Sequence, residues 1–405
     1  MRRVMVPAAA VLAAALGTFG MSLTASAVPA APPAPAAVAA VSAYNWLNGV
    51  SCLSARNCVA VGASYSSTVG ALPLAEQWNG KAWKTLAVKL PAGGVGGQLY
   101  GVSCRSGKCV AVGDFTTKGS TDFGLAETWN GARWSGVKVT EPHGATMASL
   151  LAVSCAATDH CIATGSYWLG DRHEAPLAET WNGKSWSAAT PPVPAGSTES
   201  VLNGVSCTSA ARCMAVGQAT NSPVGDSASA LTDSWNGKSW TRVAAPAPGR
   251  APTLVSVACT SAARCVAIGN SPPAEEAGVT LDTFADTWNG AKWTDALIPK
   301  PAMSATLAGV ACASAAKCLA VGNGFRNTPF GNDKAYAAEL NGTHWSLTKT
   351  PPTPAADDSM LRAAACSSPT ACIAVGLESL DTFEAPYSTA ALWNGSTWKA
   401  VNPPR

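Results

Sequence analysis

Short apolar stretches recur along the chain at a spacing of about fifty residues, and polar turn residues separate them. The first stretch of each unit reads Leu-x-x-Val-Ser-Cys, as in residues 47–52 and 202–207, and the second reads Cys-x-Ala-Val-Gly, ending at Gly62 in the first unit. The third reads Leu-Ala-Glu-x-Trp, as in residues 74–78. Short runs rich in Val between turn residues are typical of β-strands. Because no segment has a helical period, the pattern predicts strands alone.

The most constant stretch is Trp-Asn-Gly-x-x-Trp, first at residues 78–83 and once with Leu340 in place of the first Trp. Asn-Gly between apolar runs indicates a hairpin, because both central residues of a type I′ turn adopt positive φ. A two-residue turn would set Trp78 opposite Lys81 and place Trp83 diagonally on the same face. We therefore expect a fourth strand in each unit, with two indoles packed together.

Seven such units predict an all-β protein, a seven-bladed β-propeller with four antiparallel strands per blade. A single blade cannot bury both faces of its sheet, so neighbouring blades must stack. The first and last units are complete, so we expect the ring to close without an exchanged strand. The propeller should cover residues 46–405, with blades at approximately residues 46–97, 98–149, 150–200, 201–253, 254–305, 306–359 and 360–405.

The fourteen cysteines fall into seven pairs, one in each unit. A metal site would need about four Cys or His ligands at compact spacing, whereas the chain has four His and no Cys-x-x-Cys. We therefore predict one disulfide per blade and no metal. The predicted pairs are Cys52 with Cys58, Cys104 with Cys109, Cys155 with Cys161, Cys207 with Cys213, Cys259 with Cys265, Cys312 with Cys318, and Cys366 with Cys372.

The N-terminal residues 1–27 read as a secretory signal, with Arg2 and Arg3, an apolar run at residues 4–23 and a small-residue cleavage site at residues 25–27. The alternative is a membrane anchor. Residues 28–45 are dominated by Ala and Pro and predict an extended tether. No later stretch is long and apolar enough to span a bilayer. We expect a secreted, extracellular protein with no membrane span after the signal is removed.

The charge balance narrows the classes of partner. Charged residues make up 13% of the chain and the formal net charge is +3, without a basic tail, which argues against nucleic-acid binding. We expect a monomer without cofactors. Its partners are to be sought among extracellular glycans, cell-wall polymers and proteins.

The order Leu-x-x-Val, then Ala-Val-Gly, then a polar turn ending in Gly-x-x-Trp resembles the sialidase-like propeller repeats (BNR or Asp-box), especially the photosystem II assembly-factor type. The resemblance covers nearly the whole chain after the leader. Two departures are that Trp78 and its equivalents replace the family's turn Asp, and that the cysteine pairs are additional. The chain is more closely similar to secreted, cysteine-paired bacterial propellers with the same Trp-Asn-Gly-x-x-Trp signature. The resemblance implies the fold and export, and nothing about catalysis.

In a four-stranded blade, the disulfide loops and the Asn-Gly turns lie on one face of the ring, which we call the disulfide face. Its loops carry cations opposed by Asp159 alone. The plain interpretation is that turns need solvated residues. The alternative is contact with an anionic cell-wall polymer through several weak sites. The cations are Arg56, Lys81, Arg105, Lys108, Arg133, Lys184, Arg212, Lys238, Arg264, Lys292 and Lys317.

The opposite face, which we call the variable-loop face, carries the least repetitive part of each unit. Aromatic rings beside polar groups are typical of sugar sites, although loop aromatics also cover blade ends. Phe123 and Phe284 belong to the same group of loop aromatics. The predicted ligand-binding residues are Tyr65, Phe115, Tyr167, Trp168, Arg172, Phe325 and Arg326.

Catalysis has weaker support in the sequence. A glycosidase needs two carboxylates, for which Glu174 with Asp381 or Glu384 are candidates. A sialidase would want clustered arginines, and Arg362 could reach the variable-loop face but follows no recognisable pattern. The leading hypothesis is a binding or scaffold module that engages a glycan or protein through the variable loops; the alternative is a glycoside-active enzyme of the sialidase-like class.

An acid recurs two residues before the first Trp in five units. A catalytic group is needed once, so an acid that recurs is more plausibly a structural group that caps backbone or pairs with a strand neighbour. The five acids are Glu76, Glu127, Glu179, Asp233 and Asp286.

Overall fold

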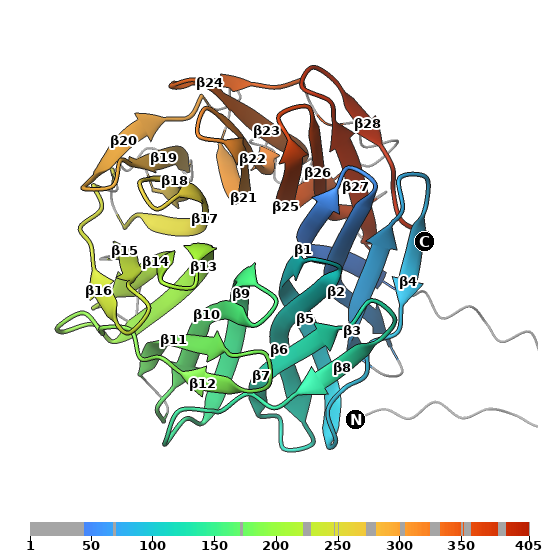
Figure 1. The fold of residues 1–405 in the computed structure, drawn as a ribbon, viewed down its shortest axis with the longest axis vertical. Helices are drawn as coiled ribbons and strands as arrows, with labels where there is room; N and C mark the ends of the chain where they lie inside the picture. The colour runs from blue at the N-terminus through green and yellow to red at the C-terminus, as the bar shows by residue number, and fades with distance from the viewer. Residues whose placement is uncertain are drawn as a thin grey trace, which may run out of the picture. The chain divides into compact units, whose positions relative to one another are not determined.

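Each repeat folds into four consecutive antiparallel strands, and in the computed structural model the seven sheets stand around a common axis (Figure 1). The structure describes residues 44–67, 70–170, 173–221, 228–246, 248–249, 251–272, 281–299, 304–324, 333–349, 351, 358–379 and 386–404. No helix in these ranges is long and apolar enough to cross a membrane. The predicted seven-bladed propeller is confirmed, and we number its blades 1 to 7 in chain order.

The first strand of each blade lies nearest the axis and the fourth lies outermost (Figure 1). The innermost strands are β1 (Tyr44–Ser54), β5 (Gly94–Arg105), β9 (Met147–Ala157), β13 (Glu199–Ser209), β17 (Thr253–Ser261), β21 (Ala305–Ser314) and β25 (Asp358–Ser368). The second strands are β2 (Asn57–Ser66), β6 (Lys108–Thr117), β10 (His160–Trp168), β14 (Arg212–Thr220), β18 (Arg264–Ser271), β22 (Lys317–Gly324) and β26 (Ala371–Ser379).

The two outer strands of each blade form the tryptophan hairpin. The third strands are β3 (Gly70–Trp78), β7 (Asp122–Trp129), β11 (Glu174–Trp181), β15 (Ser229–Trp235), β19 (Asp282–Trp288), β23 (Lys334–Asn341) and β27 (Tyr387–Trp393). The fourth strands are β4 (Trp83–Leu86), β8 (Trp134–Val137), β12 (Trp186–Ala188), β16 (Trp240–Arg242), β20 (Trp293–Leu297), β24 (His344–Leu347) and β28 (Trp398–Ala400).

The ring closes by packing between complete blades, as the intact first and last repeats predict. Blade 7 contains its own four strands, and β1 contacts β25 directly. The Asn45 N–H donates to the Pro386 carbonyl at 3.1 Å, and the Trp83 indole N–H donates to the Val401 carbonyl at 2.6 Å. Blades 3 and 4 are also joined by one parallel bridge between Glu174 and Glu199.

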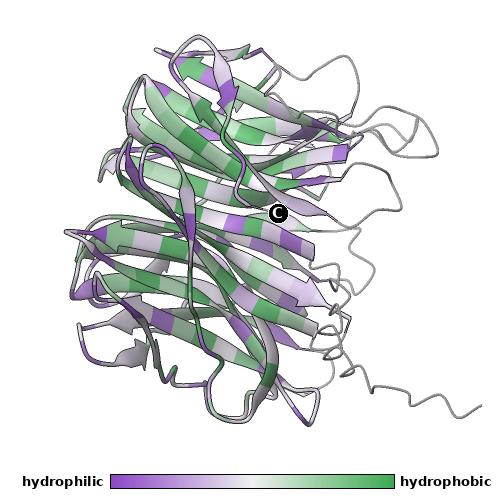
Figure 2. Cartoon of the chain, turned by 90° about the vertical axis from the view of Figure 1, so that its right-hand side faces the viewer, coloured by the Kyte–Doolittle hydropathy of each residue, from purple (hydrophilic) through white to green (hydrophobic). Residues whose placement is uncertain are grey.

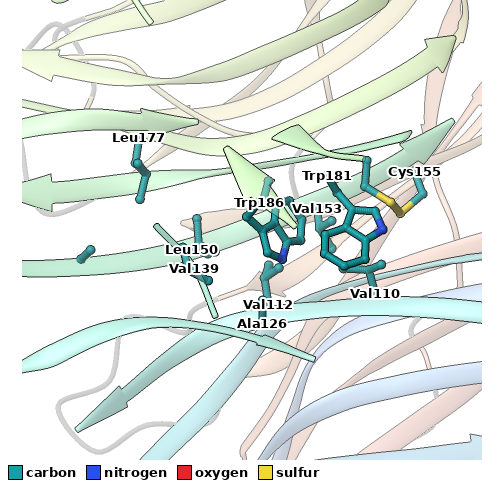
Figure 3. Packing of buried hydrophobic residues seen from close by; sticks show 13 residues of the cluster. Val110, Val112, Ala126, Val139, Leu150, Val153, Cys155, Leu177, Trp181 and Trp186 are labelled. Atoms are coloured by element: carbon teal, nitrogen blue, oxygen red, sulfur yellow. A yellow bond between two sulfur atoms is a disulfide. The ribbon is translucent and has the colours of Figure 1, made fainter. Parts of the chain in front are cut away.

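The hydrophobic core lies between blades rather than within them, because each sheet is only one layer thick. The disulfide and Trp pair of blade 3 pack against Val110 and Val112 of blade 2 (Figure 3). All seven junctions repeat this arrangement, including the junction of blade 7 with blade 1, although Leu340 replaces the first Trp in blade 6. In the side view of Figure 2, hydrophobic segments run along the strands that face the viewer.

The seven predicted disulfides are confirmed. Each joins facing residues of the first and second strands, with Cα atoms 3.9–4.0 Å apart. Each closes a loop of about seven residues, and loop-closure entropy makes such a link worth about 2 kcal/mol. Because the cysteines lie at blade junctions, the links also hold the surfaces that neighbouring blades bury.

The predicted two-residue type I′ turn is wrong, although the packed indoles are confirmed. Trp78 pairs directly with Trp83 in the register, and their ring centroids are 5.6 Å apart. The Asn79 side-chain oxygen accepts the N–H groups of Lys81 and Ala82, each at 2.9 Å. Gly80 has φ +90°, and Asn79 does not have positive φ. The Asn side chain therefore replaces a backbone acceptor, and the turn lengthens to four residues.

Every innermost strand bulges directly after its Leu, where one residue is skipped in the pairing with the second strand. A bulge bends its strand and re-aims a side chain. The skipped residues are half-buried, whereas the preceding leucines are at most 2% exposed. Seven side chains are thus placed at the inner edges of the blades: Asn48, Tyr100, Leu151, Asn203, Val255, Ala308 and Arg362.

Candidate functional site

Three polar side chains come from consecutive bulges of blades 7, 1 and 2. Arg362 Nη1 donates to Asn48 Oδ1 at 2.6 Å, and Asn48 Nδ2 donates to the Leu99 carbonyl at 2.9 Å. Because the Asn48 amide is fixed by the next blade, its oxygen is oriented toward Arg362. The guanidinium is therefore held on the inner edge of the ring by a neutral acceptor.

Three further side chains extend this arrangement through blade 2 to blade 3. Gln98 Nε2 donates to the Tyr100 hydroxyl oxygen at 2.7 Å, and the Tyr100 hydroxyl also interacts with Asp114. Ser149 Oγ donates to Asp114 Oδ2 at 2.9 Å. Four blades thus contribute to one set, in which Asn48 bonds the Leu99 carbonyl between Gln98 and Tyr100. We call it the axial cluster, and its members are Asn48, Gln98, Tyr100, Asp114, Ser149 and Arg362.

Burial governs the ionisation of the axial cluster. It raises the pKa of Tyr100, with Asp114 adding to the increase, so the phenol stays protonated. Burial also raises the pKa of Asp114, against hydrogen bonds from Ser149 and Tyr100 that lower it. Burial lowers the pKa of Arg362, but a guanidinium stays charged at any physiological pH.

Arg362 has no carboxylate within ion-pair distance among the residues that the structure describes. A half-buried guanidinium that contacts a neutral amide can still accept an anionic group through its remaining N–H donors. The axial cluster therefore has the chemistry of a site for a carboxylate or sulfate, with a hydroxyl and amides beside it.

The predicted ligand-binding residues that can be placed are spread over blades 1, 2 and 3, outside the axial cluster. Tyr65 stacks on Tyr44 in blade 1, with ring centroids 5.7 Å apart. Tyr167 packs against the core between blades 2 and 3, and Trp168 ends β10 opposite Glu174. Predicted residues outside the described ranges are Arg172, Phe325 and Arg326.

Phe115 lines a cavity in blade 2. Its ring lies 6.0 Å from that of Phe123, and the cavity, of about 430 Å³, also contacts Val139 and Glu141. Glu141 Oε1 accepts the Gly124 N–H at 2.9 Å, and burial raises the Glu141 pKa. The expectation that Phe284 is a loop aromatic is wrong, because it is 2% exposed in the core between blades 4 and 5.

Of the predicted catalytic residues, Glu174 alone is described, since Asp381 and Glu384 lie outside the described ranges. Glu174 Oε1 accepts the Ser166 hydroxyl at 2.6 Å. Burial raises the Glu174 pKa, and the charge of Glu199 raises it further. Its carboxylate neighbour in the described structure is thus Glu199, which the sequence could not indicate because the two belong to different blades.

The recurring acids are buried. Pairing with a neighbouring strand accounts for the burial of Asp233 but not for that of Glu179. Asp233 bonds Arg242 of the facing strand, with Oδ1 and Nε 2.6 Å apart, as predicted. Glu179 contradicts the prediction, because it is fully buried and neither oxygen finds a partner in the described structure. Burial, with the charge of Glu141, raises the pKa of Glu179 to about 8. Burial also raises the pKa of Glu76 and of Glu127 to about 7.

Metal ligands are not grouped in the described part of the chain, where no three His, Cys, Asp or Glu side chains lie close enough to hold an ion. The sequence did carry one signal for the axial cluster. Within Leu-x-x-Val the residue after Leu changes from blade to blade while its neighbours repeat, which gives Asn48, Tyr100 and Arg362.

Comparison with solved structures identifies propellers. A structure described as YCF48 bound to D1 peptide matches with a TM-score of 0.51 and 13% identity, over 88% of this chain and 94% of that chain. A polysaccharide lyase, an ulvan lyase bound to a GlcA(1-4)Rha3S saccharide, matches with a TM-score of 0.53 and 10% identity, over 85% and 91%. A scan of family models and a search of curated proteins return no match. At these identities the likeness shows the propeller fold alone.

Proposed function

We propose that the protein is a secreted, non-catalytic binding module that holds a carboxylate- or sulfate-bearing glycan or protein at the axial cluster and the variable loops around it. The observation that carries the proposal is Arg362, a half-buried cation whose described contact is the neutral Asn48 oxygen. Disulfides in every blade support an extracellular location. Cleavage of the signal at residues 1–27 and a tether at residues 28–45 belong to the same proposal.

The ligand would meet a fixed site rather than one assembled on binding. The guanidinium fork favours two oxygens of one anionic group, and the Asn48 amide prevents its rotation. The Tyr100 hydroxyl and the Gln98 amide add neutral hydrogen-bonding groups of the kind that sugars and peptides use. Of the two propellers of similar fold, one is described with a peptide and the other with an acidic saccharide, so both partner classes remain in the proposal.

The test is a binding screen with immobilised acidic oligosaccharides, acidic peptides and their neutral counterparts. Arg362→Gln should weaken binding of at least one acidic hit at least tenfold, since a charge-assisted bidentate contact is lost at the axis. Asn48→Ala should weaken binding less, because Arg362 loses the contact that orients its guanidinium but keeps its charge.

Asn203→Ala provides the matched control, because Asn203 occupies the equivalent bulge of blade 4 and donates to the Leu254 carbonyl at 2.9 Å in the same way. It should leave binding unchanged. Equal affinity of wild type and Arg362→Gln for every acidic hit would refute the proposal.

A glycan-cleaving enzyme is the second candidate, favoured by the convergence of Asp114, Tyr100 and Arg362 at one place. Burial raises the pKa of Asp114, which suits a general acid, whereas the raised pKa of Tyr100 leaves its phenol as a hydrogen-bond donor. Release of a chromogenic leaving group from a glycoside panel, lost in Asp114→Asn, would establish this candidate over the binding module. Turnover lost in Glu174→Gln and kept in Asp114→Asn would instead indicate the pair predicted from the sequence.

A further inference from the structure

On the disulfide face, a charged pair closes the junction between blades 6 and 7. Lys317 directly precedes the second Cys of blade 6, and its Nζ lies 3.6 Å from Glu339 Oε1 on the neighbouring strand. The two residues are diagonal neighbours in the register, on the side that faces blade 7. The space left beside them is about 10 Å³.

The same two positions hold a cation and a small hydroxyl in blades 2 and 4. Lys108 lies diagonally from Thr128, and Arg212 lies diagonally from Ser234. At these junctions the space is open, with about 240 Å³ between blades 2 and 3 and about 370 Å³ between blades 4 and 5. We call them the two open clefts; among the described residues, no Asp or Glu lines either.

The open clefts share their other walls. Each has an indole and a disulfide cysteine of the following blade on one side, Trp181 with Cys155 in one and Trp288 with Cys259 in the other. Each also contains the Asn of a tryptophan hairpin turn, Asn130 or Asn236. A cation, hydroxyl and amide groups and an apolar wall therefore recur in both clefts, and Arg105 and Lys184 also line the cleft between blades 2 and 3.

Blade 5 repeats the cation. Arg264 precedes the second Cys, and its Nε is buried without a hydrogen-bond partner in the described structure. Its diagonal neighbour is Thr287, again a small hydroxyl. Among the described residues, the Arg264 Nε–H is left unsatisfied because blade 5 has Thr287 at the position where blade 6 has Glu339.

We propose that the two open clefts each bind one acidic residue of an anionic polysaccharide, with its carboxylate on Lys108 or Arg212. Glu339 shows what this position accepts, because its carboxylate occupies the equivalent place on Lys317. The open spaces exceed the size of a carboxylate side chain, and their hydroxyl and amide groups match a uronic acid ring. Two like sites fixed on one rigid face favour a repeating polymer, since linked contacts raise the overall affinity.

The test uses the full chain and a homogeneous uronate oligomer, with the matching neutral oligomer and poly-glutamate as further arms. Thr128→Glu with Ser234→Glu gives each cleft its own carboxylate, as in blade 6, and should lower affinity for the uronate oligomer at least tenfold. Glu339→Ser changes the same position at the closed junction and should leave affinity at least as strong. Unchanged melting temperatures check that the variants fold.

Arg362→Gln separates this proposal from the one at the axis, because it should not alter uronate binding at the disulfide face. If uronate binding is lost in Arg362→Gln and kept in the double Glu variant, the ligand occupies the axial cluster and the cleft proposal is wrong. Equal binding of poly-glutamate, lost in the same double variant, would reassign the clefts to acidic protein segments and overturn the polysaccharide assignment.

Discussion

Gly217→Ala is expected to reduce the free energy of unfolding by about 3 kcal/mol or more, which is a large effect for the addition of one methyl group. A Cβ at Gly217 would lie 1.9 Å from the Val201 carbonyl oxygen and 2.9 Å from Leu202 Cα. These atoms belong to the innermost strand of blade 4, directly before its bulge, and packing on both sides prevents their retreat. Denaturant unfolding monitored by tryptophan fluorescence measures the effect.

The control for this prediction is Gly119→Ala, where the nearest atom to an added Cβ is 3.8 Å away. It should change stability by less than about 0.5 kcal/mol. Equal stability of the two variants would mean that the innermost strand can shift, and the bulge would then not be a fixed support for the axial cluster. The same approach of 1.9 Å occurs at Gly62 and Gly113, behind the bulges of Asn48 and Tyr100.

The free energy of unfolding is expected to fall as pH rises from about 5 to about 8, because buried glutamic acids must lose protons in the folded state. Glu76 and Glu127 have pKa values raised to about 7, and Glu179 has a pKa raised to about 8, each from a reference of 4.5. Their folded pKa values exceed their unfolded ones, so the stabilisation is complete below the unfolded pKa. It is lost as pH rises through the folded pKa.

Glu179→Gln isolates the largest of these contributions. One pKa unit corresponds to about 1.4 kcal/mol, so between pH 5 and pH 8 the variant should lose a pH-dependent change on the order of 4 kcal/mol. Thermal and denaturant unfolding across this range measures the slope. The exposed Asp159 supplies the control, since Asp159→Asn should leave the slope between pH 5 and pH 8 unaltered. An unchanged slope in Glu179→Gln would show that an undescribed contact satisfies this carboxylate.

Local patterns explain why so much of the fold could be predicted from the sequence. Runs such as Cys-x-Ala-Val-Gly identify strands, and Cys52 with Cys58 are close in sequence, so their hairpin brings them together whatever the blades do. Seven-fold repetition then leaves a closed ring as the way to bury both faces of every sheet. The prediction for the turn after Trp78 was wrong, because the dipeptide Asn-Gly does not reveal that the Asn side chain accepts the backbone N–H groups of the turn.

The axial cluster could not be predicted in the same way. Arg362 and Asn48 are separated by 314 positions and meet only because the last blade closes on the first. The prediction that Phe284 lies in a loop also failed. A period-two pattern does not show at which residue a strand begins, so it could not show that Phe284 lies in the core. Tyr65, Phe115, Tyr167 and Trp168 were expected in the variable loops, whereas the structure places them in the second strands β2, β6 and β10 of three different blades.

Local sequence patterns were sufficient to predict the strands, the seven blades, the disulfide pairs and the tryptophan pairs, because these depend on contacts within one repeat. The tertiary structure alone decided three features that depend on contacts between repeats. These are the bulges that bring Asn48, Tyr100 and Arg362 to the inner edge, the burial that raises the pKa of Glu179, and the carboxylate of Glu339 that closes one cleft where Thr128 and Ser234 leave two others open. A repeat specifies its own blade, whereas the chemistry of this protein lies where different blades meet.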